Sequence, residues 1–148
     1  MSGIINRPGA QSGIIGGAGQ IGYEEGTWTP VITRTTTNAS GTPSVLGHYT
    51  KIGNICYVSI YAQLNGYSGG SGQWQVSLPF TSRPGVHTQG LYNGRVYMSG
   101  DSADREFRIP ENTKLAKLHT PSNDGAFTSD ISYLIWYVNG VYEIAGTE

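Results

Sequence analysis

Alternation of apolar and polar positions is the strongest signal in this chain, and it predicts strands. From residue 55 the alternation is regular, which places successive side chains on opposite sides of an extended segment. One side carries Cys56, Val58, Ile60, Ala62 and Leu64. The other side carries Ile55, Tyr57, Ser59, Tyr61 and Gln63. We expect the first set to face the core. The second set holds two tyrosines and an isoleucine, so it predicts a second contact surface, with Ile55, Tyr57 and Tyr61 as candidates for a subunit interface.

Further short strands are predicted along the rest of the chain. They cover residues 27–37, 74–80, 90–99, 107–109 and 132–138, whereas residues 111–119 fit either a helical turn or a strand,. The glycine-rich segment 65–72 reads as a flexible loop,. Ile52-Gly53-Asn54-Ile55 predicts a tight hairpin turn, and Asn139-Gly140 predicts a type I′ hairpin from which residues 141–144 return,.

These patterns favour an all-β protein, because no amphipathic helix longer than about two turns is evident. We expect an antiparallel β-sandwich or jelly-roll-like domain over residues 23–148, preceded by an extended N-terminal arm over residues 1–22. Charged residues make up 13% of the chain, against roughly 25% in typical soluble domains,. Such a composition fits a β-rich protein with many turns and a large contact surface.

The arm is rich in glycine and carries paired isoleucines. Ser-Gly-Ile-Ile occurs at residues 2–5 and again at residues 12–15. A stable helix is disfavoured by so much glycine, and the segment is too short and interrupted to span a bilayer. We therefore expect it to lie extended on another protein chain, with packing on its own domain as the alternative. The predicted contact residues are Ile4, Ile5, Arg7, Ile14 and Ile15.

Catalytic and metal-binding patterns are not recognisable. Cys56 is the single cysteine, which excludes an intrachain disulfide, and His48, His87 and His119 have no metal-ligand spacing,. The acidic run with Asp101, Asp104 and Glu106 lacks a calcium-loop pattern and reads as a solvated loop,. There is no nucleophile elbow and no phosphate loop. We expect no enzyme activity and no cofactor.

Charge and targeting signals limit the partners. The net charge of −1 gives no electrostatic footprint for nucleic acid or for an anionic membrane,. No secretory signal is evident, so we expect synthesis in the cytoplasm. Aromatic residues offer one further possibility, a platform for stacking saccharides, although such residues are more often core or interface. The candidates for it are Tyr57, Tyr61, Tyr67, Trp74, Tyr92 and Tyr97.

Two segments resemble a recurrent pattern of bacteriophage virion proteins. YEEGTWTP at residues 23–30 and GHYTKIGNI at residues 47–55 are similar to motifs in tail-fibre and tailspike tip domains. The Leu78-Pro79-Phe80 segment resembles the LPF that often follows the next strand, so the similarity covers roughly residues 23–80. The resemblance implies a homotrimeric β-domain without enzymatic activity.

The N-terminus departs from the tail-fibre pattern, because the short arm runs straight into the β-domain without a shaft. This arrangement favours a trimeric capsid decoration (cement) protein on the virion surface, with its arm laid over subunits of the major capsid protein. The alternative is a receptor-binding tip or short fibre that contacts a host surface glycan.

Overall fold

The computed structural model describes residues 22–85, 94–98, 105–120, 125–129 and 135–146, and strands are the regular elements within them. They are β1 (Tyr23–Trp28), β2 (Ile32–Arg34), β3 (Ser44–Ile52), β4 (Ile55–Gln63), β5 (Trp74–Ser77), β6 (Gly94–Met98), β7 (Arg105–Arg108), β8 (Leu115–Thr120), β9 (Gly125–Ala126) and β10 (Ile135–Glu143). The prediction of an all-β fold is confirmed. The open choice over residues 111–119 is resolved as a strand, β8.

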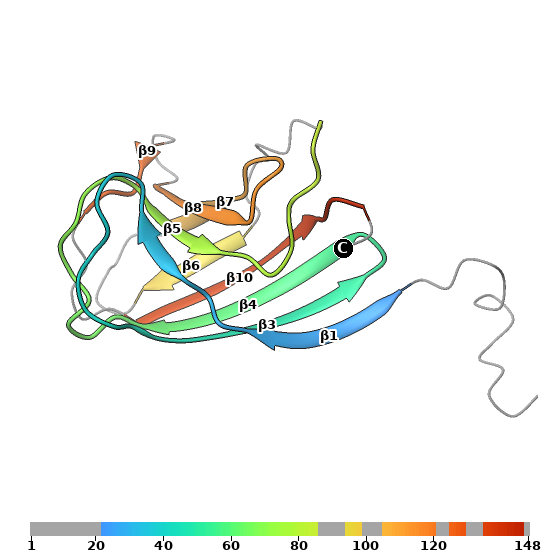
Figure 1. Ribbon diagram of the computed structural model, residues 1–148, viewed down its shortest axis with the longest axis horizontal. Coiled ribbons are helices and arrows are strands. Elements are labelled where there is room, and N and C mark those ends of the chain that lie inside the picture. The colour runs from blue at the N-terminus through green and yellow to red at the C-terminus, as the bar shows by residue number, and fades with distance from the viewer. Residues whose placement is uncertain (1–21, 86–93, 99–104, 121–124, 130–134, 147–148) are drawn as a thin grey trace, which may run out of the picture.

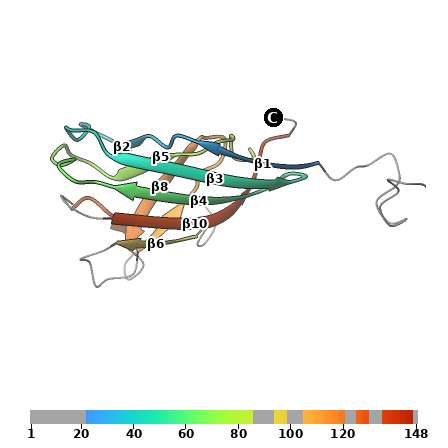
Figure 2. The same ribbon diagram turned by 90° about the horizontal axis from the view of Figure 1, so that it is seen from below.

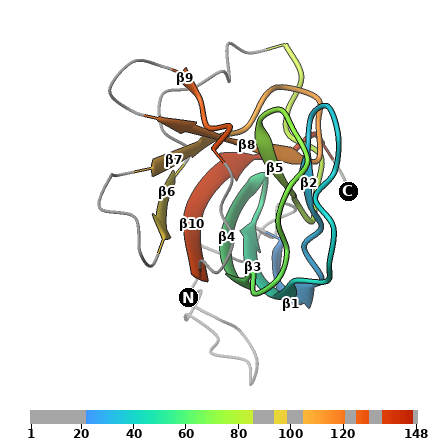
Figure 3. The same ribbon diagram turned by 90° about the vertical axis from the view of Figure 1, so that its left-hand side faces the viewer.

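All ten strands belong to one antiparallel sheet. Its order is β1-β3-β4-β10-β6-β7-β8-β5-β2, and β9 pairs with β8. The sheet curls on itself, so that β8, β5 and β2 return opposite β1, β3 and β4 (Figures 1 and 3). The two facing layers of a sandwich are thus parts of a single continuous sheet, because β6 and β7 remain paired at the bend.

The core lies inside the curl. Trp74 of β5 and Trp136 of β10 are both fully buried, and their rings meet almost perpendicularly with centroids 5.6 Å apart. Cys56, Val58, Ile60, Ala62 and Leu64 are all buried, as the alternation in β4 predicts. Burial also raises the pKa of the Cys56 thiol,. Cys56 therefore serves as a small core residue rather than as a reactive thiol.

One of the two predicted hairpins is present and the other is not. Ile52 pairs with Ile55 across a two-residue turn, and Gly53 has a φ of 60°, which glycine adopts without steric cost,. Asn139-Gly140 instead lies in the middle of β10, so the prediction of a hairpin there is wrong. Nine residues of β10 pair with β4 on one side, and five pair with β6 on the other. A hairpin turn at Asn139 would interrupt the pairing of β10 with both β4 and β6.

The predicted loop 65–72 is irregular, but a buried arginine ties it down. Arg34 of β2 is 7% exposed, and its guanidinium donates to the carbonyl oxygens of Gly69 at 2.7 Å and of Gly72 at 3.1–3.2 Å. It also donates to the carbonyl of Thr128, and its Cζ lies 4.6 Å from the centroid of the Trp74 ring. Arg34 thus joins three segments that are far apart in the sequence.

No helix long and apolar enough to cross a membrane is found in the described part of the chain.

Candidate functional site: the outer face of the sheet

The two motifs that carry the phage resemblance form neighbouring strands. YEEGTW is β1, and the segment from residue 47 to the hairpin turn is the second half of β3. They pair in register from Tyr23 opposite Ile52 to Trp28 opposite Gly47. The 16 residues between the motifs, 31–46, are the part of the chain that leaves β1, forms β2 and returns into β3.

Glycines and aromatic rings fit together across this pair of strands. A Cβ at Gly26 would lie 2.7 Å from the Tyr49 hydroxyl oxygen, and a Cβ at Gly47 would lie 2.6 Å from the Trp28 ring. Each strand thus supplies one glycine, over which the partner's ring lies. This explains why both motifs contain a glycine beside aromatic residues, since a side chain there would displace the ring.

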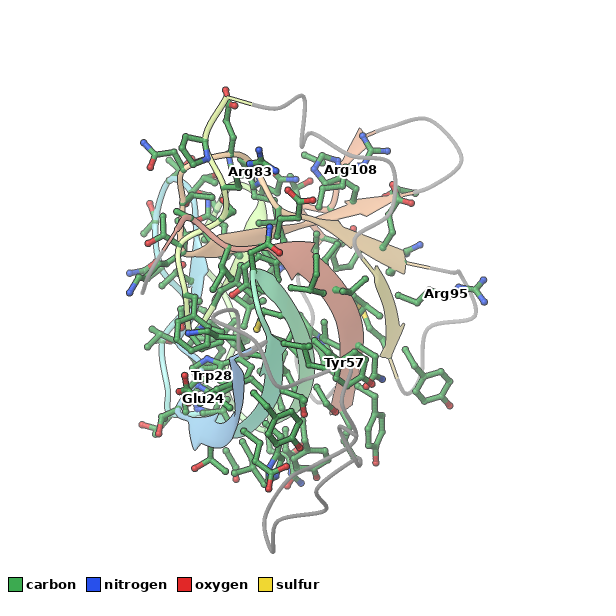
Figure 4. All side chains as sticks on the ribbon, turned by 90° about the vertical axis from the view of Figure 1, so that its right-hand side faces the viewer. Glu24, Trp28, Tyr57, Arg83, Arg95 and Arg108 are labelled. Atoms are coloured by element: carbon green, nitrogen blue, oxygen red, sulfur yellow. The ribbon has the colours of Figure 1, made fainter. Side chains whose placement is uncertain are left out.

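A small network of polar side chains lies on the same side of the β1–β3 pair. The carboxylate of Glu24 accepts hydrogen bonds from the Tyr49 hydroxyl at 2.6 Å and from the Lys51 ammonium at 3.3 Å. The bond from Tyr49, followed by that from Lys51, lowers the pKa of Glu24, and the bond to Glu24 raises the pKa of Tyr49,. Glu24 and Trp28 both lie at β1 (Figure 4). These contacts of the motif residues therefore hold β1 and β3 together.

The opposite side of the same strands is exposed and unusually apolar. Figure 2 looks onto this outer face, where β1, β3, β4 and β10 lie side by side. Eight large hydrophobic side chains on it are 40–64% exposed: Tyr23, Leu46, Ile52, Ile55, Tyr57, Tyr97, Tyr137 and Val141. Patches of this kind mark contact sites with other molecules. Ile55 and Tyr57 are thus exposed as the interface prediction requires, and Tyr61 is half-buried on the same face.

A row of tyrosines crosses one end of the outer face. Tyr61 of β4 pairs with Tyr137 of β10, which pairs with Tyr97 of β6. The ring centroids of Tyr61 and Tyr137 are 5.4 Å apart, and those of Tyr137 and Tyr97 are 6.1 Å apart. Tyr57 stands nearer the other end, where its hydroxyl donates to Asn139 Oδ1 at 3.1 Å.

The predicted saccharide platform does not exist as a single surface. Tyr67 and Trp74 are core residues, 6% and 0% exposed, so their assignment to the platform is wrong. Tyr92 lies outside the described residues. Tyr137 belongs to the tyrosine row but was not predicted. Alternation through Trp136, Tyr137 and Val138 could have identified it, had Asn139-Gly140 not been interpreted as a turn.

An open depression of about 450 Å³ lies over β1 and β3. It is lined by Glu25, Gly26, Thr27, His48, Tyr49 and Thr50 of β1 and β3. The carboxylate of Glu25 already accepts one hydrogen bond, from the Tyr23 hydroxyl at 2.7 Å. The lining offers one carboxylate, two threonine hydroxyls and an imidazole to any group that enters.

One residue of the acidic run, Glu106, does not lie in the solvated loop that the sequence predicted. Glu106 is 2% exposed on β7, rather than solvated in a loop, and accepts from the Arg108 guanidinium at 2.6 Å. Its partner across the sheet is His119, whose ring contacts the Gln73 amide at 3.0 Å. An ion pair makes the burial of this carboxylate tolerable. Asp101, Asp104 and His87 lie outside the described residues, and His48 is exposed on β3.

Among the described residues, no group of three or more His, Cys, Asp and Glu side chains could hold a metal ion. The predicted contact residues of the arm, Ile4, Ile5, Arg7, Ile14 and Ile15, lie outside the described residues.

Comparison of the chain with protein-family models, with curated proteins and with solved structures finds no match.

Proposed function

We propose that this chain is a structural protein of a bacteriophage virion. In this proposal it is a homotrimeric capsid decoration protein that stabilises the head by laying its N-terminal arm over subunits of the major capsid protein. The observation that carries the proposal is the exposed apolar outer face, which includes the two strands built from the phage-like motifs and continues over β4, β10 and β6. A protein with this surface works by contact with other chains.

The trimer contact is assigned to the outer face. Ile52, Ile55, Tyr57 and Val141 lie on adjacent strands there, with Tyr57 directly opposite Val141. Burying one such side chain stabilises an assembly by about 1.5–3 kcal/mol before ordering costs. Each protomer would contribute its own copy of the face, so formation of the trimer would bury several of these side chains at once.

The capsid contact is assigned to the arm, on sequence grounds. Its isoleucines have apolar surface to bury, while its glycines prevent it from folding alone. Extended segments bind exposed strand edges through main-chain hydrogen bonds, and three arms on one trimer add multivalency. The alternative, a fibre tip that binds a host glycan, is favoured by the row of Tyr61, Tyr137 and Tyr97 on the outer face, since tyrosine rings can stack on sugars.

The trimer is tested by light scattering at micromolar concentration. The intact protein should show about three times the chain mass of 15.9 kDa. Replacing Ile55 and Tyr57 together with aspartate should give a folded monomer, because charges cannot enter a closed apolar contact without a partner. Val31→Asp is the matched control, since Val31 is 57% exposed but lies outside this face. A monomeric wild-type protein, or a trimer that survives the double substitution, would refute the assigned contact.

The arm is tested by capsid binding. Replacing Ile4, Ile5, Ile14 and Ile15 with serine should leave the trimer folded and abolish most binding to expanded capsids, and deletion of residues 2–20 should act similarly. Sedimentation with capsids measures the bound fraction. Equal decoration by the altered and intact trimers would show that the arm is not the anchor. Quantitative mass spectrometry of virions separates the two functions: hundreds of copies indicate the head, and a few dozen or fewer indicate a fibre.

A further inference from the structure

Among the described strands, β1 forms an edge of the sheet. This strand stands at one end of the strand order and pairs only with β3 among the described strands. After Trp28 the chain turns away toward β5, where the indole nitrogen of Trp28 donates to the carbonyl of Ser77 at 3.2 Å. The run of β1 along the margin of the sheet is visible in Figures 1 and 2.

The register shows which backbone groups of β1 point away from β3, in the plane of the sheet. The Gly53 amide donates to the Gly22 carbonyl at 2.7 Å, so these two residues form a hydrogen-bonded pair. Such pairs alternate along an antiparallel ladder. Glu24, Gly26 and Trp28 therefore bond to β3, whereas the amides and carbonyls of Tyr23, Glu25 and Thr27 point away from it. These three residues offer a ready template for one more strand.

Charged side chains are the main protection of this edge against strand addition,. Natural edge strands often carry proline, lysine or a bulge, and β1 has a continuous six-residue register with neither proline nor lysine,. It carries two adjacent carboxylates, Glu24 and Glu25. Because these two side chains point to opposite faces of the strand, two copies of β1 paired antiparallel with Glu25 opposite Glu25 would bring two carboxylates together, which is unfavourable,. The edge thus repels its own copy and suits a segment of opposite charge.

The depression beside the edge gives that segment a place for a side chain. Glu25 and Thr27 line it from β1, the edge strand itself. Glu24 is already engaged by Tyr49 and Lys51, which leaves Glu25 as the carboxylate available for an incoming cation. In strand addition, main-chain bonds supply affinity, and recesses for alternate side chains supply specificity.

We propose that the β1 edge binds an extended basic segment of a partner protein by strand addition. Three residues, Tyr23, Glu25 and Thr27, form the main-chain bonds, and a lysine or arginine of the partner pairs with Glu25 over the depression. This site adjoins the apolar outer face, to which Tyr23 also belongs, but its contacts are main-chain bonds and one charge pair, and it does not depend on the virion assignment.

The test uses the full-length protein and two synthetic peptides, KVKVKVK and EVEVEVE. NMR-detected hydrogen exchange should show that the first peptide slows exchange of the Tyr23, Glu25 and Thr27 amides by about tenfold or more. The Glu24 and Gly26 amides, which already bond to β3, should change little. The acidic peptide should have no effect, and added salt should weaken the basic one.

Two variants test the main-chain bonds and the charge pairing separately. Thr27→Pro removes an outward N–H, which an edge strand tolerates, and should abolish peptide protection while thermal unfolding shows the fold intact. Glu25→Gln should weaken binding of the basic peptide and reduce its salt dependence.

Three results would overturn the proposal: equal binding of both peptides or of neither, slow exchange of the three amides in the protein alone, or a change of oligomeric state in Thr27→Pro. The last would assign the edge to a second copy of the chain.

Discussion

Replacing Arg34 with alanine is expected to lower the free energy of unfolding by about 3–5 kcal/mol. The guanidinium is 7% exposed and donates to the carbonyls of Gly69, Gly72 and Thr128. Hydrogen bonds from a charged donor are worth about 1.5–3 kcal/mol each, and the substitution removes that donor from several part-buried bonds at once,. The substitution also removes the cation from the face of Trp74,.

Thermal unfolding at fixed protein concentration measures this effect, and the midpoint should fall by roughly 10 °C. Arg34→Lys should recover only part of the loss, because a single ammonium cannot reproduce the planar fork that reaches three carbonyls. Arg83→Ala is the matched control. Arg83 is exposed and pairs with Glu143 at 2.7 Å, so its loss should cost less than about 1 kcal/mol,. Equal effects of the two alanine substitutions would refute the role of Arg34.

Replacing Gly94 with alanine is expected to destabilise the protein by about 3 kcal/mol, the upper end of the usual range for overpacking. A Cβ at this position would overlap the carbonyl oxygen of Asn139 and the ring of Phe107, and would lie 2.7 Å from the Gly140 Cα. Because two of these atoms belong to the backbone of β10, no side-chain rotation relieves the overlap. β6 would have to move away from β10.

Denaturant unfolding checks this prediction, with Gly22→Ala as control. A Cβ at Gly22 meets nothing within 4 Å, and its backbone is not in the left-handed region, so that variant should stay within about 0.5 kcal/mol of the wild type,. If Gly94→Ala were equally neutral, β6 and β10 would not approach as closely at this point as the structure shows.

Arg34 and the Asn139-Gly140 pair show which structural information the order of residues alone does not contain. Arg34 is the sort of residue that usually lies on a surface, and its burial depends on carbonyls from residues 69, 72 and 128. Asn139-Gly140 has the composition of a hairpin turn, but pairing on both sides of β10 outweighs that local preference. In both cases the deciding partners are distant in sequence.

The sequence by itself determined the elements whose cause is local. Alternation in β4 predicted which side chains are buried, because an extended strand must place successive residues on opposite faces,. Gly53 marked the turn after β3, because glycine adopts a positive φ without strain,. These preferences act within a few residues, so they can be inferred without knowing the fold.

Only the tertiary structure decided which surfaces face each other and which remain open. It paired β1 with β3, laid Trp28 over Gly47, buried Tyr67 and Trp74, and left Tyr137 beside Tyr97 on the outer face. Core and surface tyrosines have the same local preference for strands, and the curl of the sheet separates them. The place of β1 at one end of the described strands also follows from strand order, which is set by the sum of long-range pairings rather than by any one segment,.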